Sequence, residues 1–173
     1  MTHGLPTMAA LNEQACKDVQ PKYWKEPAVP RHVIQMLVID MKDNILFLHR
    51  SNKVRSAKNV WSIPSGEHDI GETVHACACR ELQEEYGLTV IDSHILEQYE
   101  NIAGDAEPPH YHWVISIYLV TVDDVHKAVN KEPDKHDQML IINADKLDIS
   151  FFDTHQFHPS LHELIKNKIY NWL

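Results

Sequence analysis

A short acidic pattern is the part of this chain best suited to chemistry. Residues 66–88 read GEHDIGETVHACACRELQEEYGL, in which a glycine-bearing loop leads into a helical segment. At about 100° per residue, three carboxylates of that helix fall within an arc of roughly 100° and lie on or beside its apolar stripe. These carboxylates belong to Glu81, Glu84 and Glu85.

The closeness of the three carboxylates has an energetic consequence. Like charges at these spacings repel, and a partly desolvated pair about 4 Å apart does so by on the order of 4 kcal/mol at an effective dielectric of about 20. A hard cation offsets such repulsion, and Mg²⁺ is commonly bound in proteins by a few carboxylates together with substrate phosphates. The stretch therefore predicts a site for a divalent cation and a polyphosphate. The alternative for the carboxylates alone is a solvated acidic face.

The complete spacing resembles the signature of the Nudix hydrolases, G-x5-E-x7-R-E-U-x-E-E-x-G-U, where U is a bulky aliphatic residue. All nine fixed positions match within residues 66–88. The resemblance implies an α/β fold, a Nudix-type α/β/α sandwich with a mixed β-sheet. It also implies attack of water on a diphosphate linked to another group. One departure is Ser65, which stands where many members have a glycine and which has less backbone freedom.

The resemblance implies a set of metal ligands. They are the backbone carbonyl of Gly66 and the carboxylates of Glu81, Glu84 and Glu85. Mg²⁺ is the expected cofactor, with Mn²⁺ as the alternative. Glu107 and Glu132 are candidates for an additional acid, because both lie in loops that flank a long strand, and exposed loop carboxylates are the simpler interpretation of either.

The same resemblance implies a catalytic set of Glu72, Arg80, Glu81 and Glu84. Arg80 is expected to orient the glutamates through a bidentate ion pair. Glu72 is expected either near the metal or as the partner of Arg80. Glu81 or a neighbour would help to deprotonate the attacking water.

Substrate contacts are expected from two loops. The basic loop over residues 49–60 supplies Arg50, Lys53 and Arg55 for phosphate, with solubility as the plain alternative. Tyr111 and His112 are expected to border the base pocket. Trp61, Phe151 and Phe152 could also stack on a base, although ordinary packing is the simpler interpretation of each.

Several substrate classes stay open. The runs at 63–67, 110–112 and 131–135 resemble the branch that cleaves nucleoside triphosphates to monophosphate and pyrophosphate. The alternatives are hydrolysis of ADP-ribose, of a nucleotide sugar or of a dinucleoside polyphosphate. A catalytically silent nucleotide-sensing module normally loses signature carboxylates, which this chain retains. Isomerase chemistry on an isoprenoid diphosphate needs a cysteine in a different setting.

Apolar runs and turn residues predict the elements that must position the signature. Strands are expected at 33–39, 45–48, 61–64, within 90–99, 113–122 and 139–142, with a turn at 42–44 and a charged loop over 123–138. Thr73 should cap the catalytic helix, which ends near Tyr86 with Gly87 after it. A capping box at 160–163 and the apolar spacing that follows predict a final helix.

Composition limits the remaining possibilities. The 173 residues suffice for one domain, and the net charge of −9 argues against a general nucleic-acid binder. Cys77 and Cys79 point to different helix faces, so with Cys16 they are expected to be reduced thiols. The thirteen histidines are expected mostly at the surface.

The predicted setting is cytoplasmic. The first thirty residues lack a signal-peptide pattern, and no window holds the roughly 18 apolar residues that span a bilayer. Residues 1–30 read as an N-terminal arm and residues 31–173 as one Nudix hydrolase domain. The expected partner is a small nucleotide, without a nucleic-acid polymer or a membrane; a homodimer is an open alternative.

Overall fold

The computed structural model describes residues 30–102, 112–158 and 161, and within these ranges the chain forms one mixed sheet of seven strands with helices beside it. The strands are β1 (Arg31–Asp40), β2 (Asn44–Arg50), β3 (Trp61–Ser62), β4 (Ser65–Glu67), β5 (Val90–Ile102), β6 (His112–Val122) and β7 (His136–Asn143). The helices are α2 (Val74–Tyr86) and α3 (Ile149–Thr154), with short 3₁₀ turns η1 (Val125–Lys127) and η2 (Ala144–Lys146).

The strand order brings the signature loop into the sheet. The main path is β3-β2-β1-β6-β5, in which β1 and β6 are parallel and the other pairs are antiparallel. Near the turn, β1 and β2 pair at Ile39 and Ile45. Near the beginning of β1, β4 lies beside it and sets Gly66 opposite Ile34, while β7 pairs with β2. Strand β1 therefore positions the start of the signature.

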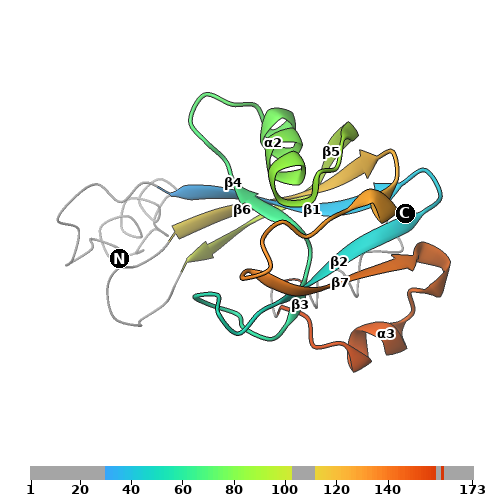
Figure 1. Cartoon of the computed structure of the whole chain (residues 1–173). Coiled ribbons are helices and arrows are strands. Elements are labelled where there is room, and N and C mark those ends of the chain that lie inside the picture. Colours follow the sequence, from blue (N-terminus) through green and yellow to red (C-terminus); the bar gives the residue numbers. More distant parts are fainter. Residues whose placement is uncertain (1–29, 103–111, 159–160, 162–173) are drawn as a thin grey trace, which may run out of the picture.

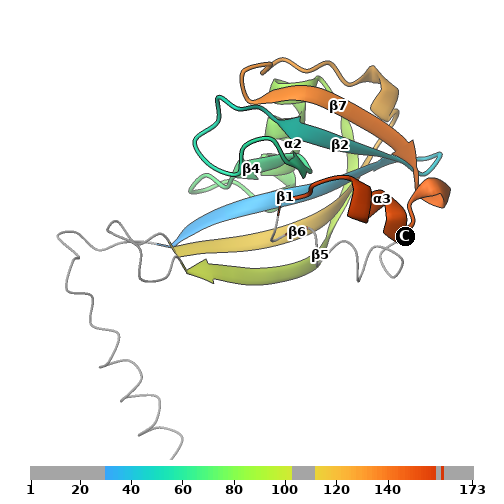
Figure 2. The same ribbon diagram turned by 90° about the horizontal axis from the view of Figure 1, so that it is seen from below.

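Two hydrophobic clusters, one on each face of the sheet, make three layers. Helix α2 covers one face and α3 lies on the other (Figure 1, and from below in Figure 2). Alternate residues of β1 serve the two clusters: Met36 and Val38 pack in the α2 cluster, whereas Leu37 and Ile39 pack in the α3 cluster. This period of two is that of a strand buried on both faces. The predicted α/β/α architecture with a mixed sheet is confirmed.

Both ends of α2 are as predicted. The Thr73 hydroxyl accepts the backbone N–H of Ala76 at 3.1 Å, as an N-cap does. At the other end Gly87 has φ 69°, and its N–H and that of Leu88 donate back to carbonyls of the last turn. Both caps are local devices, which explains why the sequence alone reveals them.

Other element predictions need correction. The predicted strand over 139–142 begins three residues earlier, at His136, and the strand at 90–99 runs on to Ile102. The charged segment 123–138 contains η1, and neither β4 nor α3 was predicted. Neither β4 nor α3 is long enough to show an apolar periodicity of its own. Pairing with β1 stabilises β4, and packing under the sheet stabilises α3. Residues 1–29 of the predicted arm, and most of the predicted final helix, lie outside the described residues.

Neither α2 nor α3 combines the length and the apolar character that crossing a bilayer requires.

Burial of His136 predicts a loss of stability in acid. Burial, and then the charge of Arg50, lower the pKa of His136 to about 4, and its Nδ1 forms a hydrogen bond of 3.2 Å with the Tyr86 hydroxyl. The unfolded chain takes up a proton near pH 6.5, so the stabilisation is complete above that pH and is lost as the pH falls toward 4. At 1.36 kcal/mol per unit the loss is on the order of 3 kcal/mol.

Urea unfolding at pH 7.5 and 4.5 checks this expectation. Replacing His136 with glutamine should make the decrease in unfolding free energy between the two pH values smaller by about 2–3 kcal/mol. An equal decrease in both proteins would contradict the role given to His136.

Candidate active site

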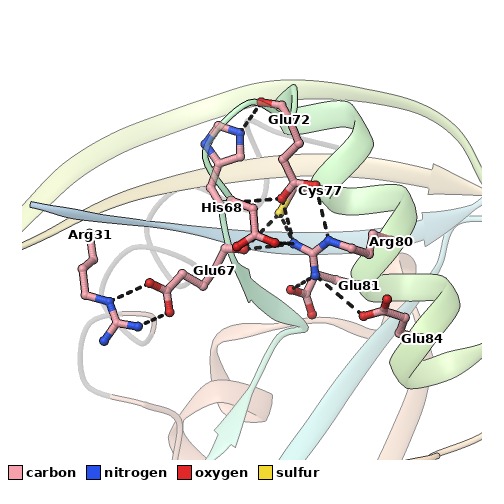
Figure 3. A network of polar contacts seen from close by, with 9 residues as sticks. Arg31, Glu67, His68, Glu72, Cys77, Arg80, Glu81 and Glu84 are labelled. Atoms are coloured by element: carbon pink, nitrogen blue, oxygen red, sulfur yellow. Dashed lines mark hydrogen bonds and ion pairs between the residues drawn. The ribbon is translucent and has the colours of Figure 1, made fainter.

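Arg80 lies at the centre of a polar network that joins the signature loop to α2 (Figure 3). Its guanidinium holds Glu72 with two nitrogens: Nη2 donates to Oε1 at 2.7 Å and Nε to Oε2 at 3.3 Å. Nη1 donates to Glu81 Oε1 at 2.6 Å, and Nη2 also donates to the Glu67 carbonyl at 3.1 Å. Of the two positions expected for Glu72, the structure therefore has the one beside Arg80.

This network favours the charged forms of its members. The hydrogen bonds from Arg80 and from the backbone N–H of Asp69 lower the pKa of Glu72 to about 2. Hydrogen bonds to Glu72 and Glu81 in turn raise the pKa of Arg80. Both groups remain ionised throughout the neutral range, so the loop stays fastened to the helix.

Gly66 is required to be a glycine because the Glu81 side chain passes directly over it. A Cβ at residue 66 would lie 2.2 Å from Glu81 Cγ and 2.3 Å from its Cδ. The residue does not have a positive φ, so the requirement is close approach and not backbone freedom. The neighbouring Ser65 belongs to β4 and also lacks a positive φ, so this departure from the family pattern introduces no backbone strain.

Exchanging Gly66 for alanine should lower turnover without unfolding the protein. The added methyl group collides with a side chain, Glu81, and not with backbone. A displacement of about 1 Å in a reacting group can reduce a rate by on the order of 100-fold, so we expect kcat to fall by about 10- to 100-fold with little change in Tm. Steady-state kinetics and a thermal melt measure the two effects.

Gly87→Ala is the matched control for this substitution. Its φ of 69° makes alanine unfavourable by about 1 kcal/mol, so this variant should melt earlier but turn over normally. A normal kcat for Gly66→Ala would mean that Glu81 has no fixed working position.

Glu85 is buried and shares a cation with a distant part of the chain. The Lys135 Nζ donates to Glu85 Oε1 at 2.9 Å and lies 2.5 Å from Glu132 Oε2. The Glu85 side chain is 7% exposed, whereas that of Lys135 is 53% exposed. Of the two candidate additional acids, Glu132 thus lies at the signature helix, and Glu107 is outside the described residues.

The pKa values of the two carboxyl groups beside Lys135 shift in opposite directions. Burial raises the pKa of Glu85 to about 7, and its interaction with Glu132 adds to this rise. The same interaction lowers the pKa of Glu132, so Glu85 is the more readily protonated of the two. Burial likewise raises the pKa of Glu81. These carboxyl groups are arranged so that additional positive charge nearby would favour their ionised forms.

The segment that carries Glu132 is fastened to the C-terminal end of α2. The backbone N–H of Lys131 donates to the Glu85 carbonyl at 2.9 Å, and its Nζ donates to the Gln83 carbonyl at 2.7 Å. The N–H of Val129 donates to the Tyr86 carbonyl at 3.0 Å. Because the last carbonyls of a helix lack partners within it, these bonds satisfy them and fix the position of the loop. No local sequence pattern signals this contact.

The predicted repulsion among the signature carboxylates is offset by the protein's own cations. Arg80 pairs with Glu81 and comes within 3.7 Å of Glu84, whereas Lys135 pairs with Glu85. The sequence argument assigned this compensation to a bound cation. Repulsion alone is therefore no evidence for a metal, and the case for one has to rest on the oxygen donors.

Within the described residues, only one group offers three ligand atoms all within 4.8 Å of one another, namely Asp40, Asp124 and His126. The Asp40 carboxylate already accepts the backbone N–H groups of Lys42 and Asn44 at 2.9 and 3.1 Å. These bonds form the turn between β1 and β2. We therefore assign Asp40 a structural role. The oxygens of Glu81, Glu84 and Glu85 do not form such a group, so their candidacy as metal ligands rests on the signature spacing and on their oxygen chemistry.

The basic loop after β2 is held by its own arginine. Arg50 Nε and Nη2 donate to the carbonyls of Ala57 and Ser56 at 3.0 and 2.9 Å. Lys53 pairs with Asp134 at 2.5 Å, and Arg55 is engaged in an interaction as well. Arg50 thus shapes the loop that was predicted to contact phosphate.

The structure describes one of the two residues predicted to border the base pocket. His112 begins β6 and lies 3.5 Å from Glu100 on β5, whereas Tyr111 is outside the described residues. Phe151 and Phe152 are buried in the cluster under the sheet, which is the packing alternative. Trp61, the first residue of β3, makes edge-to-face contacts with the rings of His49 and His155.

The structure agrees with the prediction for two cysteines and differs from it for some histidines. Cys77 and Cys79 are free, as predicted, and burial raises the pKa of Cys77 to about 12. The expectation of surface histidines is wrong for His136, which is buried, and for the partly buried pair His32 and His68. The ring of His68 contacts that of His32 at 2.9 Å and the Glu72 carbonyl at 2.8 Å, so this pair supports the signature loop.

The chain is similar to known proteins of one family. The family model described as NUDIX domain matches residues 29–173. An m7GpppN-mRNA hydrolase NUDT17 from Xenopus laevis is 26% identical over 120 residues, which are 65% of this chain and 40% of that protein. An 8-oxo-dGTP diphosphatase from Proteus vulgaris is 30% identical over 90 residues, which are 52% of this chain and 75% of the relative.

Solved structures share the fold. The crystal structure of the MutT protein from Methanosarcina mazei Go1 aligns with a TM-score of 0.63 at 15% identity, over 85% of this chain and 98% of that one. The MutT NUDIX hydrolase from Burkholderia pseudomallei aligns with a TM-score of 0.57 at 26% identity, over 69% of this chain and 87% of that one. With the signature network and the match over most of the chain, these likenesses show that the chain belongs to the NUDIX family of hydrolases.

Proposed function

We propose that this chain is a divalent-metal-dependent pyrophosphohydrolase that cleaves a nucleoside triphosphate to the monophosphate and pyrophosphate. The observation that carries the proposal is the assembly of carboxylates around the end of α2, with Glu81 over Gly66 and Glu85 beside Glu132. Both pairs join parts of the chain that are distant in sequence, and neither serves the hydrophobic core. Such an arrangement is typical of a site for a ligand.

The donor set fits Mg²⁺, with Mn²⁺ as the alternative. Carboxylates of Glu81, Glu84 and Glu85 would hold the ion, with the Gly66 carbonyl as a further ligand. Glu132, which pairs with the same lysine as Glu85, would add one more oxygen. All are hard oxygen donors, and a cation beside Glu85 would oppose the effect of burial, which raises the pKa of this carboxyl. When bound, such an ion polarises phosphoryl oxygens and lowers the pKa of water.

The protein's own residues would supply orientation and proton transfer. Arg80 holds Glu81 in one direction by a 2.6 Å hydrogen bond, and Glu72 holds Arg80. Glu81 is partly buried and its pKa is raised by burial, as suits a base that takes a proton from the attacking water. Glu84 is 62% exposed and faces the solvent from which substrate arrives.

The relatives support a nucleotide substrate and suggest a second candidate. A diphosphatase of 8-oxo-dGTP agrees with the triphosphate branch that the runs at 63–67 and 131–135 resemble. The substrate named for the relative from Xenopus laevis, a capped mRNA, also contains phosphates joined to a nucleoside, but the chain spans only 40% of that relative's length. We therefore place the free nucleoside triphosphate first and the cap second.

A substrate panel tests the proposal. Nucleoside triphosphates including 8-oxo-dGTP, ADP-ribose, nucleotide sugars, dinucleoside polyphosphates and a capped RNA are incubated with the protein and Mg²⁺, and products are identified by chromatography. Pyrophosphate with monophosphate, formed only when the cation is present, is the expected result. Cleavage of the cap alone would favour the second candidate. Absence of turnover on the whole panel, despite measurable nucleotide binding, would favour a sensing module.

A further inference from the structure

Lys135 lies among the carboxylates of the candidate site. Its Nζ is 2.9 Å from Glu85 and 2.5 Å from Glu132, and its charge also acts on Glu81. The ammonium thus pairs with both carboxylates and provides part of the compensation that a divalent cation would provide.

The position of Lys135 is fixed by its backbone. Ser51 in the basic loop donates its N–H to the Lys135 carbonyl at 2.9 Å and its hydroxyl to the Asp134 carbonyl at 2.5 Å. The N–H of Lys135 donates to the Glu132 carbonyl at 2.9 Å. The turn that precedes β7 is thus bonded to the loop after β2 and fixes the backbone of Lys135, whose side chain is 53% exposed.

We propose that Lys135 is a resident counter-ion of the site: it holds Glu85 and Glu132 together when no divalent cation is bound, and it competes with that cation for them. The inference rests on the proposed metal function. A single ammonium cannot share the oxygens of Glu85 and Glu132 with a divalent cation without mutual repulsion. Lys135 is therefore a positioning residue that sets the cation concentration at which the site fills.

Removal of the charge tests this competition. Lys135→Met should lower Tm without cation by a few degrees at pH 8.5, because two neighbouring carboxylates lose their counter-ion. In the same protein, calorimetric titration with Mn²⁺ alone should show binding about 10-fold tighter than in the wild type. A merely structural lysine would give the opposite, with weaker binding accompanying the lower Tm.

Lys127→Met is the matched control. Lys127 forms an exposed pair with Asp123 at 2.6 Å, and its removal should change neither Tm nor Mn²⁺ affinity appreciably. Lys135→Arg keeps the charge and should keep the affinity within about threefold of wild type. If Lys135→Met does not fold, Lys135→Gln removes the charge while keeping a hydrogen-bonding group.

Two further results separate the inference from the proposed function. If Glu85→Gln binds Mn²⁺ as the wild type does, the metal assignment is wrong and the inference fails with it. If Glu85→Gln loses binding while the methionine and glutamine variants of Lys135 bind no more tightly than wild type, only the role of Lys135 is overturned.

Discussion

Replacing Glu85 with glutamine is expected to lower kcat by at least about 100-fold while the protein stays folded. Glutamine keeps the shape of the side chain and removes the charge that a hard cation requires. Loss of a group that only supports a metal ligand typically costs 10- to 100-fold in activity or affinity, so loss of a ligand itself should cost more. Steady-state kinetics at saturating Mg²⁺ measure the effect.

The same variant should be the more stable protein when no cation is present. Burial raises the pKa of Glu85 to about 7, so the fold favours its protonated form. That contribution is complete below the unfolded value near 4.5 and is lost as the pH rises through 7. Glutamine is not subject to this loss, so a melt at pH 8 should show a Tm a few degrees above wild type.

Asp145→Asn provides the comparison, because it neutralises an exposed carboxylate on η2 that belongs to no part of the site. It should alter neither kcat nor Tm. A Glu85→Gln protein that turned over near the wild-type rate would count against the metal assignment. A lower Tm would instead show that the charged pair with Lys135 is a net source of stability.

Exchange of Arg80 for lysine should lower kcat by about 10- to 100-fold. Arginine reaches Glu72 with two nitrogens and Glu81 with a third, a geometry that one ammonium cannot reproduce. The fold should survive because the caps and core face of α2 are untouched. Turnover and Mn²⁺ affinity are both measured, since Arg80 acts through Glu81 and both should fall.

A double-mutant cycle with Glu72→Gln identifies the path of this effect. If Arg80 works as a unit with Glu72, the double variant should lose little more than Arg80→Lys alone, with a coupling of at least about 1 kcal/mol. Losses that simply add would mean that the two residues act independently, contrary to the network seen around Arg80.

The parts of this molecule that were predictable are those whose cause is local. Thr73 and Gly87 satisfy backbone groups within the same helix, and the turn before β2 forms within five residues. The alternation along β1 is visible because the strand is buried on both faces. The signature spacing likewise places its carboxylates on one helix, whatever the rest of the fold does.

Long-range contacts account for what was missed. The short strand β4 is stabilised by pairing with the part of β1 that precedes its pairing with β2. Helix α3 is stabilised by packing on the face of the sheet opposite α2. No short window of sequence contains both partners of such contacts.

By itself the sequence determined the family, the helix that carries Glu81, Glu84 and Glu85, and the ends of that helix, because helical periodicity and capping act over a few residues. Only the tertiary structure decided that Glu81 passes over Gly66 and that Lys135 and Glu132 meet Glu85, fifty residues along the chain from Lys135. Those meetings depend on the strand order and on unsatisfied carbonyls at the end of α2, which attract the distant loop. Lys135 and Glu132, which lie outside the signature, therefore contribute to the charge around the candidate site.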